Sequence, residues 1–445
     1  MEYVCDFHLH SKYSRAVSQA MVLPEIEKWA IKKGIDVLTA SDFTHPLWFR
    51  EIKNQLEEDN GVYKIKNSSS KIRFILSTEI SSIYSQGGKT RRIHNLVFAP
   101  SFATVEKINA ELIKRGCNLG ADGRPIIGLS SRNLLELILS IDSNSILIPC
   151  HAWTPWFSLY GSNSGFDSID ECFMDLSSEI YGIETGLSSD PEMNWRIKEL
   201  DNRSILSFSD AHSAIKMGRE ATVFKIKNQR SKIKNISFSD IKSAIKRDPR
   251  SNLEIAYTIE FYPEEGKYHY TGHRNCQVKQ TPQETKEKGV ICPVCHRPLT
   301  VGVMHRVEKL AGRPTNIITS IDELGVTWIE DGRGTHPKYV KLVPLVEIVA
   351  ESLSVMPGSL KVLAKFDEMI SKFGSEFRIL LKTSISDIEK SFGEKIAQGI
   401  DKVRKQKIYI DPGFDGEFGK VKIWEDEANK IQSEKVKAEE QMGLF

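Results

Sequence analysis

Residues 1–220 alternate short apolar runs with amphipathic stretches. The apolar runs predict strands at 3–8, 35–40, 74–77, 95–99, 145–150, 180–184 and 205–209. The stretches between them have apolar positions at helical spacing and predict helices at 24–33, 46–58, 105–115, 132–140 and 191–201. Alternating strands and helices are typical of a parallel sheet, either open or closed into a barrel.

Two further patterns follow in the second half of the chain. Residues 266–314 have weak periodicity and are rich in Cys, His and Gly, which indicates a small module. Residues 338–424 are amphipathic again, mostly helical until Ile408 and then strand–turn–strand. The composition, 40% hydrophobic and 27% charged over 445 residues, is that of a globular protein and excludes a mostly disordered chain.

The chain shows no sign of a membrane segment. No apolar run approaches about 18 residues, and the start, MEYVCDFHLH, lacks the features of a signal peptide. We therefore expect a cytoplasmic protein, in which disulfides between its seven cysteines are not expected.

The net charge of +2 does not indicate a nucleic-acid binder, but the charges are unevenly distributed. Residues 221–250 contain nine Lys and Arg and two Asp. Such a run is either a solvated face or linker, or a strip that neutralises phosphates.

Histidines and carboxylates gather at the ends of the predicted strands. Five of the six histidines in the first 212 residues lie at or near a strand's C-terminal end, and His94 instead opens its strand or lies in the turn before it. In a strand, residues i and i+2 face the same side, so His8 converges with His10, and Asp210 with His212. Strand C-termini are where α/β barrels build active sites. The predicted ligands are His8, His10, Asp42, Glu79, His94, His151, Asp210 and His212.

These ligands are too many for one ion, so we expect two or three divalent metals. Imidazole suits Zn, and carboxylates suit Mn and Mg, so the identity of the metals stays open. Clustered ions are the usual device for hydrolysing phosphate esters, because one activates water and another stabilises the leaving oxygen. We assign the catalytic work to Asp210, His212 and His10, with Asp210 orienting or deprotonating the water.

A second set of donors has the spacing of a structural zinc site. His273 and Cys276 precede the knuckle formed by Cys292 and Cys295, and together they predict one structural zinc ion. His269 or His305 could replace His273. Four protein ligands leave no open position, so this module cannot supply the chemistry alone.

The first set of donors resembles the PHP (polymerase and histidinol phosphatase) family over about half of the chain. The resemblance rests on the HxH opening, the DxH close, and Glu79, His94 and His151 between them. It implies an α/β fold, a distorted (βα)7 barrel with a trinuclear metal site.

Two positions depart from that family's common pattern. Arg15 stands where many members have a histidine, which makes it a candidate phosphate clamp, although a surface ion pair is the alternative. Asp42 is followed by Phe43 where a histidine is usual, and His45 comes three residues after Asp42. We favour Asp42 as the ligand, with His45 behind it or as an alternate ligand.

The segment 184–191 follows a predicted strand and opens a helix, so it could contact phosphate or form a plain loop. Within it, Thr185 and Ser189 are candidate substrate-binding residues, and we expect the loop 182–190 to contribute to a base pocket. The aromatics Trp153, Trp156 and Phe157 follow His151 and could stack a base or cap the barrel.

Over nearly its whole length the chain is similar to the endonuclease Q family. The similarity rests on the order of a PHP barrel, a zinc module (GKYHYTGHRNC and CPVCHRPLTVGVMHR) and a helical C-terminal region with LVPLVEIVAE, FGSEFRILL and DPGFDGEFGKVKIW. It implies a metal-dependent DNA repair endonuclease that cuts 5′ of deaminated bases (hypoxanthine, uracil, xanthine) and of abasic sites. The alternatives are a small-molecule phosphatase and a non-catalytic DNA-binding accessory protein.

The expected organisation is therefore a PHP-type barrel, a small zinc module and a mainly helical C-terminal domain. The expected boundaries are 1–225 for the barrel, 226–265 for a basic connecting segment, 266–314 for the zinc module, 315–424 for the helical domain and 425–445 for a charged tail.

The tail ends in QMGLF, which is similar to the pentapeptide by which bacterial repair and replication proteins dock on the sliding clamp. It predicts clamp binding through Gln441, Met442, Leu444 and Phe445.

Overall fold

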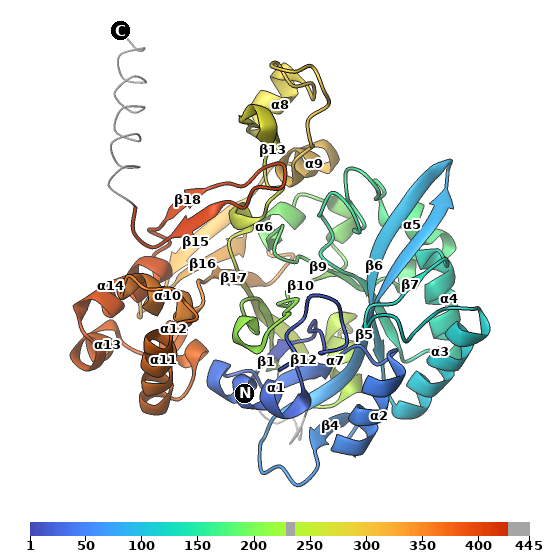
Figure 1. Cartoon of the computed structure of the whole chain (residues 1–445), viewed down its shortest axis with the longest axis horizontal. Helices are drawn as coiled ribbons and strands as arrows, with labels where there is room; N and C mark the ends of the chain where they lie inside the picture. The colour runs from blue at the N-terminus through green and yellow to red at the C-terminus, as the bar shows by residue number, and fades with distance from the viewer. Residues whose placement is uncertain (228–235, 426–445) are drawn as a thin grey trace.

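The computed structural model describes residues 1–227 and 236–425 (Figure 1). Its first half is the expected distorted α/β barrel. The parallel strands β1 (Glu2–Asp6), β2 (Val37–Ala40) and β5 (Arg73–Gln86) lie side by side, as the alternating pattern predicts. The barrel continues through β6 (Lys89–Ala99), β8 (Ile146–Pro149), β9 (Gly182–Glu184) and β10 (Ser204–Leu206). A parallel bridge between Leu9 and Ala211 joins the last strand back to the first.

The barrel departs from a purely parallel arrangement at β6. Strands β5 and β6 form one long antiparallel hairpin, and β8 pairs antiparallel with β6. The apolar runs at 74–77 and 95–99 mark only the fully buried part of these strands, because the hairpin continues with polar residues on both arms. His94 consequently lies in the middle of β6 and does not open it.

Helices cover the outside of the barrel and begin mostly at side-chain caps. Ser101 and Ser130 accept hydrogen bonds from backbone N–H groups in the first turns of α3 and α4, which supplies acceptors that a helix start lacks. The helices are α1 (Leu23–Lys33), α2 (Pro46–Gln55), α3 (Phe102–Lys114), α4 (Ser131–Ile141), α5 (Ile169–Phe173) and α6 (Pro191–Asn194). Two predicted helices end early: 46–58 gives way to the hairpin β3 (Leu56–Asp59) and β4 (Val62–Ile65), and 191–201 continues as a 3-10 turn, η2 (Lys198–Leu200).

The sheet of the barrel extends beyond residue 220. Strand β11 (Ala221–Ile226) pairs with β1, and β12 (Leu253–Glu260), reached through α7 (Phe238–Ile245), pairs with β11. The sheet then continues through β17 (Lys338–Lys341), β16 (Thr327–Asp331) and β15 (Ile317–Ile321). Parts of the predicted connecting segment and of the predicted helical domain are thus strands of one sheet.

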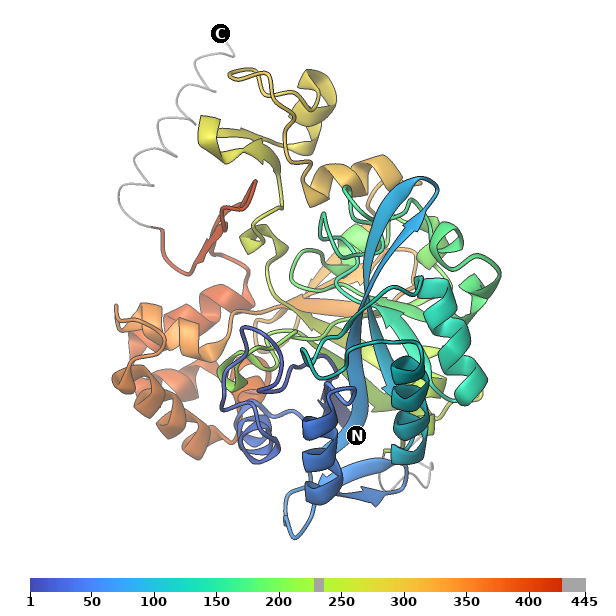
Figure 2. The same ribbon diagram turned by 45° about the vertical axis from the view of Figure 1, so that its right-hand side comes forward.

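The Cys-rich segment protrudes from the body (yellow in Figures 1 and 2). It contains the hairpin β13 (Thr271–His273) and β14 (Val278–Gln280), then α8 (Pro282–Lys288) and α9 (Val303–Leu310). The C-terminal helices are α10 (Leu345–Ser352), α11 (Leu360–Phe373), α12 (Glu376–Lys382), α13 (Ile385–Phe392) and α14 (Glu394–Arg404). They are followed by the predicted strand–turn–strand, β18 (Tyr409–Asp411) and β19 (Lys420–Lys422).

Three buried charged residues hold the helical region in place. Lys33 of α1 and Glu376 of α12 form an ion pair at 2.8 Å, which joins the barrel to the helices. Arg404 donates hydrogen bonds to four carbonyl oxygens, those of Leu324, Ile379, Leu380 and Thr383.

Within the described ranges, no helix is both long enough and apolar enough to cross a bilayer.

Candidate active site

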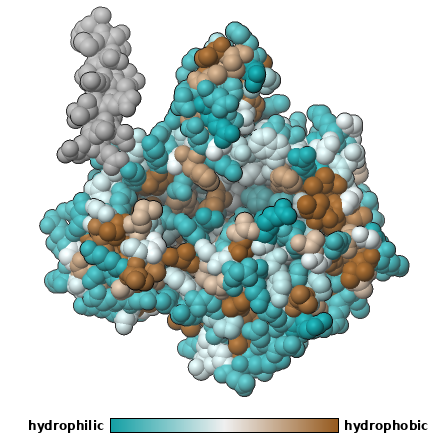
Figure 3. Space-filling model, viewed as in Figure 1, coloured by the Kyte–Doolittle hydropathy of each residue, from teal (hydrophilic) through white to brown (hydrophobic). Residues whose placement is uncertain are grey.

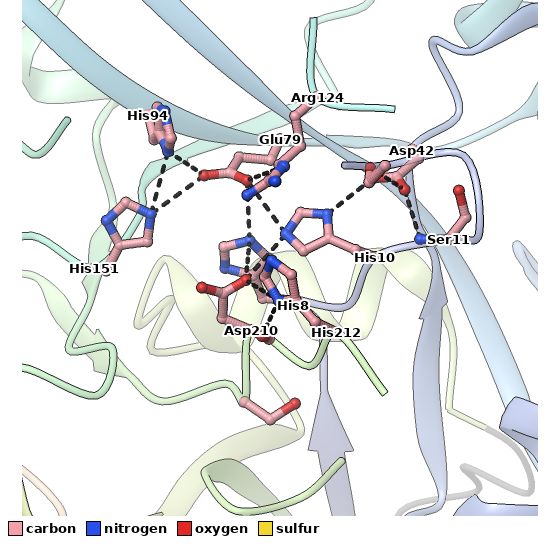
Figure 4. Close-up of polar contacts among 12 residues, drawn as sticks. His8, His10, Ser11, Asp42, Glu79, His94, Arg124, His151, Asp210 and His212 are labelled. Atoms are coloured by element: carbon pink, nitrogen blue, oxygen red, sulfur yellow. Dashed lines mark hydrogen bonds and ion pairs between the residues drawn. The ribbon is translucent and has the colours of Figure 1, made fainter. Parts of the chain in front are cut away.

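The barrel mouth brings most of the predicted metal donors together (Figure 4). His8 and His10 follow β1, Glu79 and His94 lie on the β5–β6 hairpin, His151 follows β8, and Asp210 follows β10. His8, His10 and Glu79 are buried, whereas Asp210 is partly exposed. The predicted donors form two clusters, each compact enough for one metal ion, and a third group, of His8, Glu79 and the buried thiol of Cys150, overlaps both.

The first cluster consists of His8, His10 and Asp210. His10 Nε2 lies 3.0 Å from Asp210 Oδ1 and 3.3 Å from Glu79 Oε2. His8 Nε2 lies 3.7 Å from the same two carboxylate oxygens.

The second cluster consists of Glu79, His94 and His151. Glu79 Oε1 lies 2.5 Å from His94 Nδ1 and 3.2 Å from His151 Nε2. Glu79 therefore faces the second cluster with one oxygen and the first cluster with the other.

The atoms in this site fit divalent cations. His8 Nε2 and Glu79 Oε2 are buried and have no hydrogen-bond partner within the described part of the chain. Buried polar atoms nearly always have a hydrogen-bond partner. Two buried atoms that lack one and that could both bind a metal therefore indicate a site for an ion between them. Imidazole nitrogens and carboxylate oxygens together suit Zn and Mn.

The electrostatics of the site show strong mutual stabilisation of opposite charges. Burial lowers the pKa of His10, but the carboxylates of Asp42, Asp210 and Glu79 outweigh it and raise the pKa to about 10. Burial raises the pKa of Asp210, yet His8 and His10 hold it below the usual range. The carboxylates thus generate a negative potential that favours cations at this place.

Glu184, which the sequence analysis did not assign, orients two of the donors. Its buried carboxylate lies 2.8 Å from His8 Nδ1 and accepts a hydrogen bond from the backbone N–H of His151. Carboxylates behind metal-binding histidines fix the ring and its tautomer. The signal was available, since Glu184 ends a strand just as the predicted ligands do. The next loop also needs Gly186, because a Cβ there would lie 2.4 Å from His151 Cβ.

The structure places three predicted metal ligands or alternates outside the two clusters. Asp42 lies behind His10, 3.1 Å from its Nδ1, and accepts hydrogen bonds from Ser11 and Ser14. His45 caps α2 and stacks on the ring of Tyr13. His212 lies beside His10 but belongs to neither donor group.

The three residues predicted to bind substrate, Thr185, Ser189 and Arg15, do not direct their side chains at the metal donors. Thr185 and Ser189 are buried, and their hydroxyls donate to the carbonyl oxygens of Leu206 and Thr185 respectively. Their side chains are thus committed to the protein interior, and their neighbours Leu187 and Ser188 line the pocket described below. Arg15 is exposed, and its backbone N–H and carbonyl contact Asp122 and Arg124 respectively.

A pocket of about 610 Å³ opens beside the clusters and is largely apolar. His94, His151 and Asp210 lie in its wall. Its aromatic lining consists of Trp156, Phe157, Tyr268 and Phe418. Trp153, by contrast, is buried and donates to Asn194, so of the two tryptophans only Trp156 faces the pocket. Figure 3 shows this face of the molecule hollowed beneath the protruding module.

The second donor set also comes together. His273, Cys276, Cys292 and Cys295 place one ligand atom each within 4.8 Å of the others. Burial raises the pKa of the Cys292 thiol, but hydrogen bonds from the Cys295 backbone and from His273 outweigh it and bring the pKa down to about 6. A thiol that ionises near neutral pH is suited to zinc. His269 and His305, the alternatives to His273, are not part of this group.

Comparison with known proteins agrees with this architecture. Residues 344–407 match the family model of the MJ0043 C-terminal domain. The protein MJ0043 of Methanocaldococcus jannaschii is 33% identical over 277 residues, which cover 61% of this chain but only 31% of that protein. The protein YqxK of Bacillus subtilis is 28% identical over 402 residues, covering 88% of this chain and 89% of that protein.

Two solved structures are similar along almost the entire chain. One is the lesion-specific endonuclease PfuEndoQ from Pyrococcus furiosus, with a TM-score of 0.78 and 28% identity over 97% of this chain and 99% of that one. The other is endonuclease Q in complex with a 27-mer duplex that has an abasic lesion at the active site, with a TM-score of 0.78 and 30% identity. That match covers 96% of this chain and 97% of the other.

A distorted α/β barrel with clustered imidazole and carboxylate donors at its mouth places the chain among the PHP-type hydrolases. Within that class, the chain belongs to the endonuclease Q family. The family expected from the sequence is thereby confirmed, as is the PHP-type fold.

Replacing Glu184 with glutamine should weaken metal binding in the barrel by about 10- to 100-fold, because the amide no longer fixes the His8 ring. Competition with a chelator measures this affinity. Glu111→Gln, on the surface of α3 and paired with Arg115, is the matched control and should bind metal as the wild type does. Equal affinities for the two variants would contradict the role given to Glu184.

Replacing Cys292 with serine should remove one equivalent of zinc from the protein, because one of four ligands is lost. Elemental analysis of the purified protein measures this. Cys117→Ser, far from the module in sequence, is the control and should retain full zinc content. Unchanged zinc in Cys292→Ser would overturn the ligand set.

Proposed function

We propose that this chain is a metal-dependent DNA repair endonuclease that hydrolyses the phosphodiester 5′ of deaminated bases (hypoxanthine, uracil and xanthine) and of abasic sites. Its membership of the endonuclease Q family and the metal donors of the barrel support this proposal. The observation that carries it is the position of the aromatic pocket, whose wall includes three of those donors.

The pocket is suited to a nucleobase that has left the helix. A base inside a duplex is hidden, and extruding it costs a few kcal/mol, least when it is mispaired or missing. Trp156 and Tyr268 lie with ring centroids 5.4 Å apart, and Phe418 is 70% exposed at the pocket rim. Exposed aromatic faces stack bases of any sequence. A base held there would keep the adjacent backbone close to the clusters.

Basic side chains near the pocket match the charge of the DNA backbone. Lys267 Nζ lies 5.5 Å from the centre of the Tyr268 ring and 5.7 Å from that of Phe418, and Arg92 also lines the pocket. Contacts of this kind to phosphates fix the register of a protein on DNA without reading its sequence.

The residues of the two clusters divide the chemical work. His8, His10 and Asp210 would hold one cation and Glu79, His94 and His151 another. Divalent ions held there would lower the pKa of a bound water towards neutrality and would neutralise charge on the phosphate. Asp210 is the carboxylate that lines the pocket, so it is placed to orient the attacking water and to accept its proton.

The clamp-binding peptide lies outside the described residues, so docking through Gln441, Met442, Leu444 and Phe445 rests on the sequence alone.

Replacing Asp210 with asparagine should reduce cleavage of a duplex with one deoxyuridine or deoxyinosine by about 10³-fold, because it weakens both a cation site and the proton acceptor. DNA binding should remain near the wild-type affinity. A gel assay for a single cut 5′ of the lesion measures the rate, with Asp175→Asn on the surface as control.

The same assay separates the proposal from its competitors. A wild-type protein that hydrolyses a small aryl phosphate but leaves lesion DNA intact would be a phosphatase. A wild-type protein that binds DNA tightly but does not cleave it, whichever divalent metal is added, would be an accessory protein.

Replacing Trp156 with alanine should lower kcat/KM on deoxyuridine and deoxyinosine duplexes by about 10- to 100-fold, which corresponds to one lost stacking contact. An abasic duplex has no base to stack, so its cleavage should change much less and serves as the internal control. An equal loss on all three substrates would show that Trp156 does not contact the base.

A further inference from the structure

Arg124 lies at the centre of the candidate active site, although no metal-ligand or phosphate-binding motif marks it in the sequence. It belongs to the loop between α3 and β7 (Ile126–Ile127). Its side chain is 23% exposed, and its Nε lies 3.9 Å from Glu79 Oε2. Figure 4 shows its guanidinium beside Glu79, the residue that faces both donor clusters.

Hydrogen bonds fix both the side chain and the backbone of Arg124. Arg124 Nη2 donates to the carbonyl oxygen of Arg15 at 3.1 Å. Asp122 Oδ1 accepts hydrogen bonds from the backbone N–H groups of both Arg124 and Arg15. The guanidinium therefore has a defined position and is not a free surface side chain.

The guanidinium nevertheless keeps most of its hydrogen-bonding capacity. Within the described part of the chain, its one hydrogen bond is that to Arg15, and the contact with Glu79 is too long to be a second. The Glu79 carboxylate is held by histidines, two of them at Oε1, and not by a tight ion pair with Arg124. The remaining N–H groups are available to a ligand with several oxygens, and a planar guanidinium fork matches the oxygens of a phosphate.

We propose that Arg124 is a catalytic residue that contacts a non-bridging oxygen of the scissile phosphate and stabilises its charge. In the reaction, a water oxygen bonds to phosphorus while the bond from phosphorus to the 3′ oxygen breaks. The 3′ oxygen leaves with the electron pair and takes a proton from solvent water, and the attacking water loses a proton to Asp210. Charge on the non-bridging oxygens must be balanced throughout, which a fixed cation beside them does without reorganisation.

This assignment rests on the proposed function and gives Arg15 a different role from the one its sequence position indicates. The carbonyl of Arg15 positions Arg124, whereas its side chain is exposed. Arg115, an exposed arginine at the end of α3 that pairs with Glu111, has no contact with the site in the described part of the chain, which makes Arg115→Ala the matched control.

The test compares Arg124→Ala, Arg124→Lys and Arg115→Ala under single-turnover conditions on a duplex with one abasic site. Arg124→Ala should slow cleavage by about 10²- to 10³-fold, Arg124→Lys should recover part of the loss, and Arg115→Ala should cut near the wild-type rate. Metal content of Arg124→Ala should equal that of the wild type, and added guanidinium chloride at millimolar concentration should raise its rate.

Three results would overturn the assignment. These are an unchanged rate in Arg124→Ala, a loss of barrel metal in that variant, or an equal loss of rate in Arg115→Ala. A wild-type protein that cuts no lesion DNA would instead contradict the proposed function. Hydrolysis of bis(p-nitrophenyl) phosphate then decides the role of Arg124: a selective loss in Arg124→Ala supports phosphate contact, and equal rates exclude it.

Discussion

The buried carboxylate of Glu79 is the constraint on which the site depends. An ionised carboxylate with almost no solvent contact is costly unless opposite charge or hydrogen bonds surround it. Glu79 meets this requirement with imidazoles on both oxygens, and in doing so it determines where both donor clusters lie. The strand ends and loops of the barrel mouth place those imidazoles around this one carboxylate.

The β5–β6 hairpin is the part of the fold that makes this geometry possible. Its register pairs Glu79 with Leu96 and Ser81 with His94, so Glu79 and His94 are diagonal neighbours on one face of the two strands. A purely parallel barrel would bring these residues together only at strand ends. Because β6 instead runs antiparallel to β5, His94 reaches the barrel mouth from the middle of a strand.

The sequence predicted the parts of the site that follow from local periodicity. The i,i+2 spacing of His8 and His10 and the strand-end position of His151 required no knowledge of the tertiary structure. The antiparallel hairpin was not predicted, because residues 78–86 and 89–94 are mostly polar and lack the apolar signal of a buried strand.

Roles that depend on contacts between distant segments could not be predicted in this way. Asp42 has the residue type of a metal ligand, but whether it faces the clusters or the back of His10 depends on a turn with a positive φ of 56°. Thr185 and Ser189 have hydroxyls suited to phosphate, yet burial beneath the loop directs both inward. Arg124 comes 109 residues after Arg15, the residue whose carbonyl holds it.

The two departures from the PHP pattern, at positions 15 and 43, leave both donor clusters intact. Phe43 is fully buried in the hydrophobic core, so it cannot act as a donor, and the side chain of Arg15 is exposed. Two complete donor clusters remain without them, and a guanidinium held by the Arg15 carbonyl stands beside the carboxylate that both clusters share. A fixed organic cation adds positive charge without needing ligands of its own. Positions 15 and 43 therefore contribute no metal donor, and the guanidinium of Arg124 adds positive charge beside Glu79.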